Sequence, residues 1–456
     1  MFFQRIKTPA LAHHAYVLGS GGQALVVDPR RDVDAYLRVA REAGLTITHV
    51  LETHRQEDYL IGSLALARAT GATIVTGAHE RFGHGDLHLA DGAELTVAGL
   101  RIRALHTPGH TPESTSYAVF VSEAPHLAWA VFTGDTLFAG ATGRTDLTDP
   151  TRTAEYAGML FDAVHEKLLP LGEQVLVFPA HGPGSVCGRH IAPRDETTLG
   201  LERATNSVFT LDREAFVRAK LAEHVPRPPY FDRVASLNAR GGAPVARDPN
   251  EVRVLGAGAF DAARKQALVL DTRSPEAFAG GHLPGSLAIF RHLLGIFAGW
   301  FVGAGTKVLL VLEDEADATD AVAELARIGI DDVEGILAGG FGAWRDAGRP
   351  VERSGTISPS DLHERRGEFV VLDVREGSEH AEGHIEGSRH AYVGHLESRL
   401  ESLGIRQSDR VAVTCSVGNR SGLAVSLLLR RGFRDVTNVL GGMTAWKRLG
   451  LPIVVG

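Results

Sequence analysis

The chain has 456 residues, of which 44% are hydrophobic and 22% are charged, and these values are ordinary for folded globular proteins. At roughly 150 residues per domain, this length predicts about three domains, each large enough to bury a core of its own. The 55 acidic and 47 basic residues give a net charge of -8 with no Lys/Arg block, which argues against nucleic acid as a partner.

The cysteine content and the apolar runs indicate where the protein works. Two cysteines in a chain of this length argue against a disulfide framework and are typical of a reducing compartment. The opening segment lacks the basic end and apolar run of a signal peptide, and no later run approaches about 18 apolar residues. We therefore expect a cytoplasmic protein that does not associate with a membrane.

The first 245 residues alternate two kinds of pattern, which predicts an α/β domain. Strands that end in polar loops are predicted at 24–29, 48–54, 73–77, 95–111, 117–120, 127–138 and 174–182. Helices are predicted at 32–44, 63–71 and 153–169. A segment rich in Gly, Pro and charge at 238–250 predicts a linker after this domain, and a second linker is predicted at 349–356.

Four of the strand-end loops carry side chains that can ligate a metal ion: His54 with Asp58, His110, Asp135 and His181. Two neutral imidazoles and one carboxylate, with coordination positions left open, suit Fe(II) that activates O2. His54, His110 and Asp135 would supply this set. The chain has 21 histidines, so a surface or core role is the alternative for each one. We assign such roles to His13, His14, His84, His88 and His165.

The order of these loops resembles a known family. The motifs TPGHTP, FTGDTLF followed by GRTD, and PAHG resemble the metallo-β-lactamase fold over roughly the first 240 residues, and in this order the persulfide dioxygenase branch. The resemblance implies an αββα sandwich. It also implies one mononuclear Fe(II) per chain, held by the matching His54, His110 and Asp135.

One departure from the family pattern is informative. The usual H-x-H-x-D-H signature appears here as HRQEDY, from His54 to Tyr59, so two histidines are missing. The dinuclear zinc hydrolases of this fold need both, and Gln56 and Tyr59 cannot replace neutral imidazole ligands. A thioester hydrolase of the glyoxalase II type is therefore disfavoured. His181 and Asp58 then become groups that orient the ligands or hydrogen-bond the bound sulfur.

Two nearby residues have open interpretations. Arg144, in GRTD, either receives a carboxylate of a thiol such as glutathione through a bidentate contact or stabilises its own loop. For Cys187, in the glycine-containing segment GPGSVCG, we favour a buried packing role over a role in sulfur relay.

The rest of the chain is an internal repeat. The segment that starts at Leu270 is echoed by the segment that starts at Leu372, and Trp344 and Trp446 are in register 102 positions apart. Apolar runs followed by helical patterns predict a parallel sheet with crossover helices in each copy. The sequence thus predicts three domains, at residues 1–245, 250–352 and 357–456.

In the second copy, Cys415 stands at the end of a predicted strand, before a short loop and a helix. The backbone amides of such a loop and the start of the helix stabilise a thiolate or an anionic adduct, and Arg420 adds a cation. With its neighbouring motifs, the segment resembles a rhodanese domain, whose related phosphatases have a loop one residue longer, so sulfur transfer is favoured over dephosphorylation. A buried structural cysteine is the alternative. The predicted persulfide loop is Ser416, Val417, Gly418 and Asn419.

The first copy resembles the same fold but lacks the chemistry. Leu312 stands where the second copy has Cys415, and Asp317 stands where it has Arg420. The intervening acidic residues, Glu313, Asp314 and Glu315, would repel the anions that an active loop binds. We interpret this module as an inactive rhodanese-like domain that serves as an adaptor or a dimer surface.

Over nearly its whole length the chain resembles persulfide dioxygenase–rhodanese fusions. The implied function is oxidation of a low-molecular-weight thiol persulfide by O2 to sulfite at iron, with interconversion of persulfide and thiosulfate at Cys415. The thiol (glutathione, coenzyme A or another) and the direction of sulfur flow stay open. We expect a homo-oligomer, either a dimer or a tetramer. Two other classes are a two-metal hydrolase with an accessory rhodanese domain and a non-enzymatic sulfide-responsive scaffold.

Overall fold

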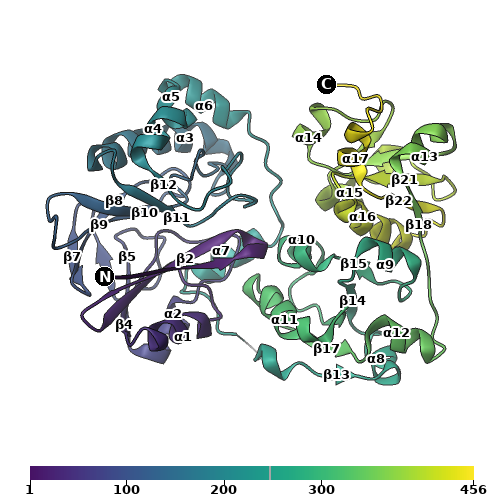
Figure 1. Ribbon diagram of the computed structural model, residues 1–456, viewed down its shortest axis with the longest axis horizontal. Coiled ribbons are helices and arrows are strands. Elements are labelled where there is room, and N and C mark those ends of the chain that lie inside the picture. Colours follow the sequence, from purple (N-terminus) through teal and green to yellow (C-terminus); the bar gives the residue numbers. More distant parts are fainter. Residues whose placement is uncertain (246–247) are drawn as a thin grey trace. The chain divides into compact units, whose positions relative to one another are not determined.

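A computed structural model describes residues 1–245 and 248–456 (Figure 1). The chain divides into two compact units. The first is Met1–Val245 with the short segment Arg327–Gly329, and the second holds the remaining residues. The boundaries expected between the three domains stay predictions, and residues 246 and 247 of the first expected linker lie outside the described residues.

In the described part of the first unit, one six-stranded sheet runs in the order β1-β2-β3-β4-β5-β6. Its strands are β1 (Phe2–Thr8), β2 (His13–Ser20), β3 (Gln23–Val27), β4 (Thr46–Leu51), β5 (Thr73–Gly77) and β6 (Leu87–Leu89). The first three pair antiparallel and the last four parallel. The sequence patterns miss β1 and β2, since the buried His13 and His14 obscure the apolar pattern of β2.

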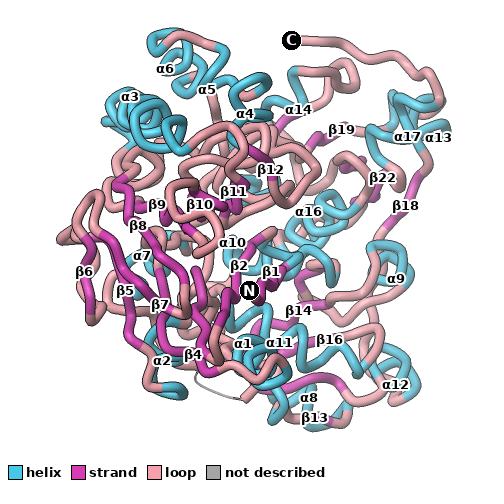
Figure 2. Tube along the Cα trace, turned by 60° about the vertical axis from the view of Figure 1, so that its left-hand side comes forward, coloured by secondary structure: helices cyan, strands magenta, loops and turns pink. Residues whose placement is uncertain are grey.

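The second six-stranded sheet of the described first unit has the order β12-β11-β10-β9-β8-β7 (Figure 2). Its strands are β7 (Glu94–Val97), β8 (Leu100–His106), β9 (Thr115–Phe120), β10 (Ala128–Gly134), β11 (Leu176–Pro179) and β12 (Thr197–Thr198). The expected single strand at 95–111 is in fact the hairpin β7–β8. Its turn places Ala98 and Gly99 at φ values of 51° and 70°, which break an extended run.

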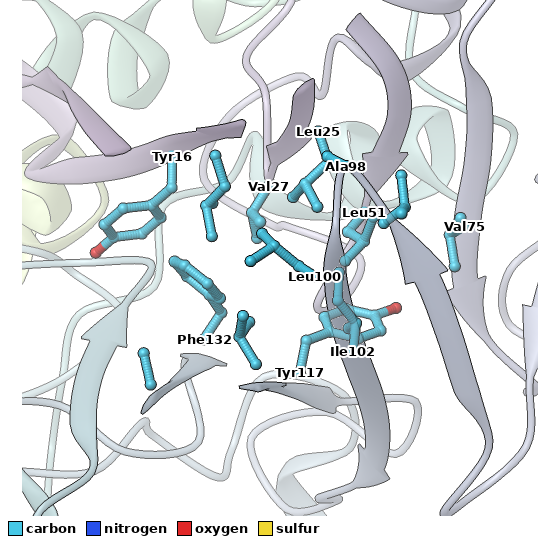
Figure 3. Close-up of a cluster of buried hydrophobic side chains, with 14 of the residues drawn as sticks. Tyr16, Leu25, Val27, Leu51, Val75, Ala98, Leu100, Ile102, Tyr117 and Phe132 are labelled. Carbon is cyan, nitrogen blue, oxygen red and sulfur yellow. The ribbon is translucent and has the colours of Figure 1, made fainter. Parts of the chain in front are cut away.

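The two sheets pack face to face around one apolar core. Figure 3 shows Val27 and Leu51 of the first sheet facing Tyr117 and Phe132 of the second, and all four side chains are buried. Alternate residues of β3 point to the opposite face of the sheet, where Val26 packs beside helical side chains. Because both faces of the sheet are covered, its strands read as continuous apolar runs in the sequence.

Helices cover the two outer faces. Tyr36 and Leu66 pack on the first sheet, whereas Leu160 and Phe216 pack on the second. The αββα sandwich implied by the family resemblance is therefore confirmed. The helices of this unit are α1 (Asp34–Glu42), α2 (Ser63–Thr70), α3 (Thr153–Ala163), α4 (Leu199–Thr205), α5 (Ser207–Thr210), α6 (Arg213–Leu221) and α7 (Phe231–Asn238).

The described part of the second unit contains two five-stranded sheets in which every pair of neighbouring strands is parallel, as expected. The first has the order β13-β17-β16-β14-β15, with strands at Val254–Leu255, Val333–Leu337, Val308–Val311, Leu268–Asp271 and Leu287–Ala288. The second has the order β18-β22-β21-β19-β20, with strands at Gly355–Ile357, Val436–Val439, Val411–Thr414, Val370–Asp373 and Arg389–His390.

Helices flank both of these sheets. Those of the first repeat are α8 (Ala257–Ala263), α9 (Pro275–Gly280), α10 (Leu294–Phe301), α11 (Ala318–Arg327) and α12 (Gly340–Asp346). Those of the second repeat are α13 (Pro359–Glu364), α14 (Gly377–Ala381), α15 (Leu396–Arg399), α16 (Asn419–Arg430) and α17 (Gly442–Arg448). Among the described residues, none of the helices combines the length and the apolar character needed to cross a membrane.

The two repeats share one packing plan. Trp344 and Trp446 are each buried in their own core, and each indole N–H donates to a proline carbonyl six residues later at 2.9 Å. The strands that precede Leu312 and Cys415 end at corresponding positions of the two repeats, at Val311 in β16 and at Thr414 in β21. The repeat detected in the sequence is therefore a repeat of structure.

Candidate functional site

His54, His110 and Asp135 meet at the strand ends of the first unit. His54 follows β4, His110 lies in the loop between β8 and β9, and Asp135 directly follows β10. All three are buried. The Nε2 atom of His110 lies 3.4 Å from Oδ2 of Asp135, and the Nε2 atom of His54 lies 3.7 Å from the same oxygen. Residues that are far apart in the sequence thus form one cluster.

A glycine shapes this strand end. Gly134 has φ of +53°, and a Cβ atom there would lie 2.5 Å from Oγ1 of Thr53, next to His54. Only glycine allows this conformation and this close approach without strain. Gly134 therefore brings Asp135 close to the loop that carries His54.

Hydrogen bonds set the tautomers of both histidines. Nδ1 of His110 lies 2.8 Å from the carbonyl oxygen of Arg144, which only accepts, so this nitrogen carries the proton. Nδ1 of His54 lies 2.9 Å from the Thr53 hydroxyl, whose own proton goes to Asp28, so this nitrogen also donates. In both histidines the Nε2 lone pair is left free to face Asp135.

The cluster fits a divalent metal ion. Neither Nε2 atom has a hydrogen-bond partner among the described residues, although both are buried. Two ligands with bonds of about 2.1 Å to one ion lie about 3 to 4 Å apart, and the distances of 3.4 and 3.7 Å agree with this range. Burial lowers the pKa of His54 to about 3 and also lowers that of His110, so both imidazoles are neutral, as ligands must be.

His181 connects the cluster to Asp58. Its Nδ1 lies 2.7 Å from Asp135 Oδ1, and its Nε2 lies 3.0 Å from Asp58 Oδ2. Burial lowers the pKa of His181, but the two carboxylates outweigh burial and raise it well above its usual range. Burial likewise opposes ionisation of Asp135, but the charge and the hydrogen bond of His181 lower its pKa below its usual range. The charged His181 therefore orients Asp135 and keeps it ionised.

Hydrogen-bonding side chains stand where the family signature has its two missing histidines. The Tyr59 hydroxyl lies 2.7 Å from Nε2 of His13, and the side-chain amide of Gln56 lies 3.3 Å from Nδ1 of His54. His13, which the sequence assigns to the background histidines, is thus buried beside Tyr59. Its position on β2 could have been found only by recognising that strand.

Arg144 is held within its own surroundings. Its side chain donates to both carboxylate oxygens of Asp146 and to the carbonyl oxygens of Val186, Val225 and Pro226. These bonds use all five N–H groups of a guanidinium. The geometry favours the loop-stabilising interpretation of Arg144 over a bidentate contact to a substrate carboxylate.

Two further groups lie against the cluster. Cys187 is buried with Phe138 and Ala141, and burial raises the pKa of its thiol well above the usual range. Its sulfur and one ligand atom each of Asp58 and His181 all lie within 4.8 Å of one another. Sequence reasoning missed Glu57, which is buried within the same distance of both metal-facing histidines. In the sequence it shows only as a second acidic residue, next to Asp58, within the altered signature.

In the second unit, Cys415 lies in a compact loop between β21 and α16. Its sulfur is buried and accepts a hydrogen bond from the Gly418 amide at 3.1 Å. The Ser421 hydroxyl lies 3.3 Å from the sulfur and donates its proton to Oδ1 of Asn438 at 2.6 Å. Gly418 has φ of +112°, and a Cβ atom on Gly442 would collide with the Cys415 carbonyl oxygen. The loop thus directs a backbone donor at the sulfur, which favours a thiolate or a persulfide there.

Arg420 lies at the same loop but is already paired. It donates to both carboxylate oxygens of Glu379, at 2.6 and 2.7 Å, and to the Ser416 hydroxyl at 2.6 Å. Ser416 in turn donates to Glu379 at 2.7 Å. The sequence analysis identified Arg420 and Ser416 but not Glu379, which lies 36 positions before Cys415 in the chain.

Comparison with known proteins assigns these parts to families. The family model described as the metallo-beta-lactamase superfamily matches residues 8–181 of the sequence. The family model of the rhodanese-like domain matches residues 258–347 and 358–449. The hydroxyacylglutathione hydrolase of Pseudomonas entomophila (strain L48) is 35% identical over 222 residues, which are 43% of this chain and 81% of that protein. The chain belongs to the metallo-β-lactamase superfamily.

Two further similarities extend this assignment. The human mitochondrial persulfide dioxygenase ETHE1 is 28% identical over 247 residues, which are 53% of this chain and 89% of that protein. A crystal structure of a metallo-beta-lactamase from Staphylococcus aureus is 28% identical with a TM-score of 0.66, and the match covers 74% of this chain and 98% of that one. The expected organisation, a metallo-β-lactamase domain followed by two rhodanese-like domains, is confirmed.

The two rhodanese-like domains differ at the active loop. In the first, Leu312 follows β16 and is buried where the second has Cys415. Gly340 there approaches the Leu312 carbonyl as Gly442 approaches that of Cys415, so the backbone frame is kept. The Glu315 carboxylate accepts from the Gly339 amide at 2.5 Å, so an acidic side chain occupies this loop.

Proposed function

We propose that this metallo-β-lactamase–rhodanese fusion oxidises a low-molecular-weight thiol persulfide to sulfite at a single iron and transfers sulfane sulfur at Cys415. One observation carries the proposal: His54, His110 and Asp135 form a two-imidazole, one-carboxylate set whose nitrogen lone pairs are free, a set that suits Fe(II). The similarity to persulfide dioxygenases agrees with it. Two free cysteines accord with a cytoplasmic, reducing location.

The balanced reaction defines what the first site must do. A persulfide R–S–SH, O2 and water give the thiol R–SH and sulfurous acid: the S–S bond breaks, the terminal sulfur loses four electrons, and O2 accepts them. When bound, Fe(II) would supply the one-electron chemistry that O2 needs to react with a closed-shell sulfur compound. His54, His110 and Asp135 would hold the ion. His181 would keep Asp135 oriented, and the burial of the cluster would exclude bulk water.

At the second site the chemistry is nucleophilic. The Cys415 thiolate attacks the outer sulfur of thiosulfate, the S–S bond of thiosulfate breaks, sulfite leaves with the bonding electron pair, and Cys415 holds a persulfide. In the opposite direction, sulfite attacks the outer sulfur of this persulfide and regenerates the thiolate and thiosulfate. The Gly418 amide would stabilise the anionic sulfur. Leu312 offers no sulfur to the first rhodanese-like domain, which we propose is inactive.

Hydrolysis of a thioester is the second candidate function. The similarity to hydroxyacylglutathione hydrolases favours it, as does the proximity of the ligand atoms of Asp58, His181 and Cys187. Against it, both nitrogens of His181 already face carboxylates, and Tyr59 and Gln56 stand where the family signature has histidines. A second metal ion would have to displace these hydrogen bonds.

Two measurements on the purified full chain separate these candidates. Metal analysis should find about one iron per chain, and O2 consumption should depend on added glutathione persulfide. Two tightly bound zinc ions with hydrolysis of S-lactoylglutathione, and no O2 uptake with persulfide, would overturn the proposal in favour of the hydrolase. O2 uptake without persulfide would indicate simple oxidation of the metal, so that rate is subtracted as a control.

A further inference from the structure

Glu57 is a buried carboxylate at the metal cluster that the proposed function does not yet use. Its side chain is only 3% exposed, and neither oxygen has a hydrogen-bond partner among the residues that the structure describes. Oε2 of Glu57 lies 3.9 Å from Nε2 of His110. Ligand atoms of His54, Glu57 and His110 all lie within 4.8 Å of one another.

The protein surroundings of Glu57 balance the negative charge of its carboxylate only weakly. Arg55 is the cation paired with it, at 3.8 Å between Nη2 and Oε1, which is too long for a hydrogen bond. A buried carboxylate without hydrogen bonds is costly to maintain unless a cation balances it. On its other side, Glu57 faces the same two imidazoles that face Asp135.

We propose that Glu57 is a fourth protein ligand of the metal ion held by His54, His110 and Asp135. The inference rests on the proposed metal site and refines it. Glu57 lies 3.9 Å from His110, within the range of about 3 to 4 Å that separates two ligands of one ion. The distances from His54 and from His110 to Asp135 fall in the same range. An ion at the cluster would satisfy atoms that otherwise lack partners within the described structure: Nε2 of His54, Nε2 of His110 and a carboxylate oxygen of Glu57.

A fourth ligand has two chemical consequences. Two carboxylates balance the charge of a divalent ion, so the occupied site carries no net charge and can stay buried. In an octahedral shell, four protein ligands leave two open positions instead of three. Two positions admit O2 and one sulfur atom, so this site favours substrates that bind through a single atom over chelating substrates.

The test is the affinity of the full chain for Co(II), which reports coordination through its visible spectrum. Co(II) is titrated into the metal-free protein against a competing chelator, for the parent and for Glu57→Gln. We expect the substitution to weaken binding by at least about 10-fold and to change the absorption bands, because one ligand is lost. These readouts do not depend on catalytic activity.

Glu113→Gln is the matched control. Glu113 is also fully buried, its oxygens also lack hydrogen-bond partners in the described chain, and it also lies 3.8 Å from Arg55. It is not part of the group formed by His54, His110 and Glu57. Glu113→Gln should therefore leave affinity and spectrum unchanged. If both substitutions weakened Co(II) binding equally, the effect of Glu57 would come from its charge alone and not from ligation, and the inference would be overturned.

The other outcomes are also decisive. Parent-like affinity and bands in Glu57→Gln would overturn the ligand role and leave the proposed function intact, whereas a parent chain that binds no Co(II), or two ions, would count against the proposed function itself. Circular dichroism of the metal-free proteins checks folding. If Glu57→Gln does not fold, Glu57→Asp replaces it, and unchanged affinity and bands in that shorter carboxylate would contradict direct ligation.

Discussion

Arg420 donates two hydrogen bonds to Glu379, from Nη1 to Oε2 at 2.6 Å and from Nη2 to Oε1 at 2.7 Å, beside the loop that carries Cys415. The pair has two effects that oppose each other. It stabilises the domain, because Arg420 is largely buried and needs a counter-charge. It also places a carboxylate near the loop that we propose receives thiosulfate or sulfite, and like charges repel.

The substitution Glu379→Gln separates these effects. We expect the KM for thiosulfate to fall by about threefold, because one negative charge near the anion site is removed. We also expect the free energy of unfolding to fall by about 1–3 kcal/mol, because Arg420 loses its ionic partner. Steady-state kinetics and urea unfolding of the full chain measure the two. Glu368→Gln, which breaks exposed pairs with Arg365 and Arg410, is the control and should not change KM.

The same ion pair predicts a pH dependence of stability. Partial burial opposes ionisation of Glu379, but Arg420 outweighs it and lowers the pKa from 4.5 to about 2. A lowered pKa means that the ionised carboxylate stabilises the folded state above pH 4.5, and that this contribution is lost as the pH falls from 4.5 towards 2. The difference in unfolding free energy between the parent and Glu379→Gln should therefore shrink over this range. A difference that grows as the pH falls would contradict the ion pair.

The metal cluster yields a third prediction. His54→Ala and Asp135→Ala should each lose bound iron and all persulfide-dependent O2 uptake, because each removes one member of a three-residue set. Sulfur transfer by Cys415 should persist, since the substituted residue lies in the other unit. Metal analysis, an O2 electrode and a thiosulfate assay measure these effects. His49→Ala alters a half-buried histidine in the middle of β4 and should keep iron and O2 uptake.

The candidate ligands and the candidate nucleophile at the strand ends could be predicted from the sequence, whereas the side chains that contact them could not. The loops after β4, β8 and β10 are marked by residue types that metals bind, and short apolar runs locate the strands before them. Glu379 carries no such mark, because a lone glutamate reads as surface unless the fold buries it. Glu57 lies in a marked loop, but only the fold shows that its side chain turns towards His54 and His110. Arg144 shows the converse, since its motif left open a contact to a substrate carboxylate, and the tertiary structure uses all its donors within the protein.

The first rhodanese-like domain gives a fourth prediction. Neutralising its acidic loop with Glu313→Gln, Asp314→Asn and Glu315→Gln should leave sulfur transfer by Cys415 within about twofold of the parent, because the domain has Leu312 in place of a nucleophile. Asn and Gln keep oxygen acceptors for the Ala316 and Gly339 amides, so stability should change little. A thiosulfate assay and thermal unfolding measure both. A selective loss of transfer in a well-folded variant would show that this domain takes part in the chemistry.

The last prediction concerns the two domains that we propose are active. We expect them to be coupled through sulfite, which is the product expected at iron and an acceptor for sulfane sulfur held on Cys415. With glutathione persulfide and O2, the parent should yield appreciable thiosulfate, and Cys415→Ser should yield mainly sulfite while it consumes O2 at the parent rate. A serine hydroxyl cannot form a persulfide, yet it nearly preserves the volume of the buried thiol.

Chromatography of the products decides the direction of sulfur flow between the iron site and Cys415. Equal thiosulfate from both proteins would refute forward coupling, whereas O2 uptake driven by thiosulfate and thiol in the parent alone would establish the reverse flow, in which Cys415 supplies persulfide to the iron site.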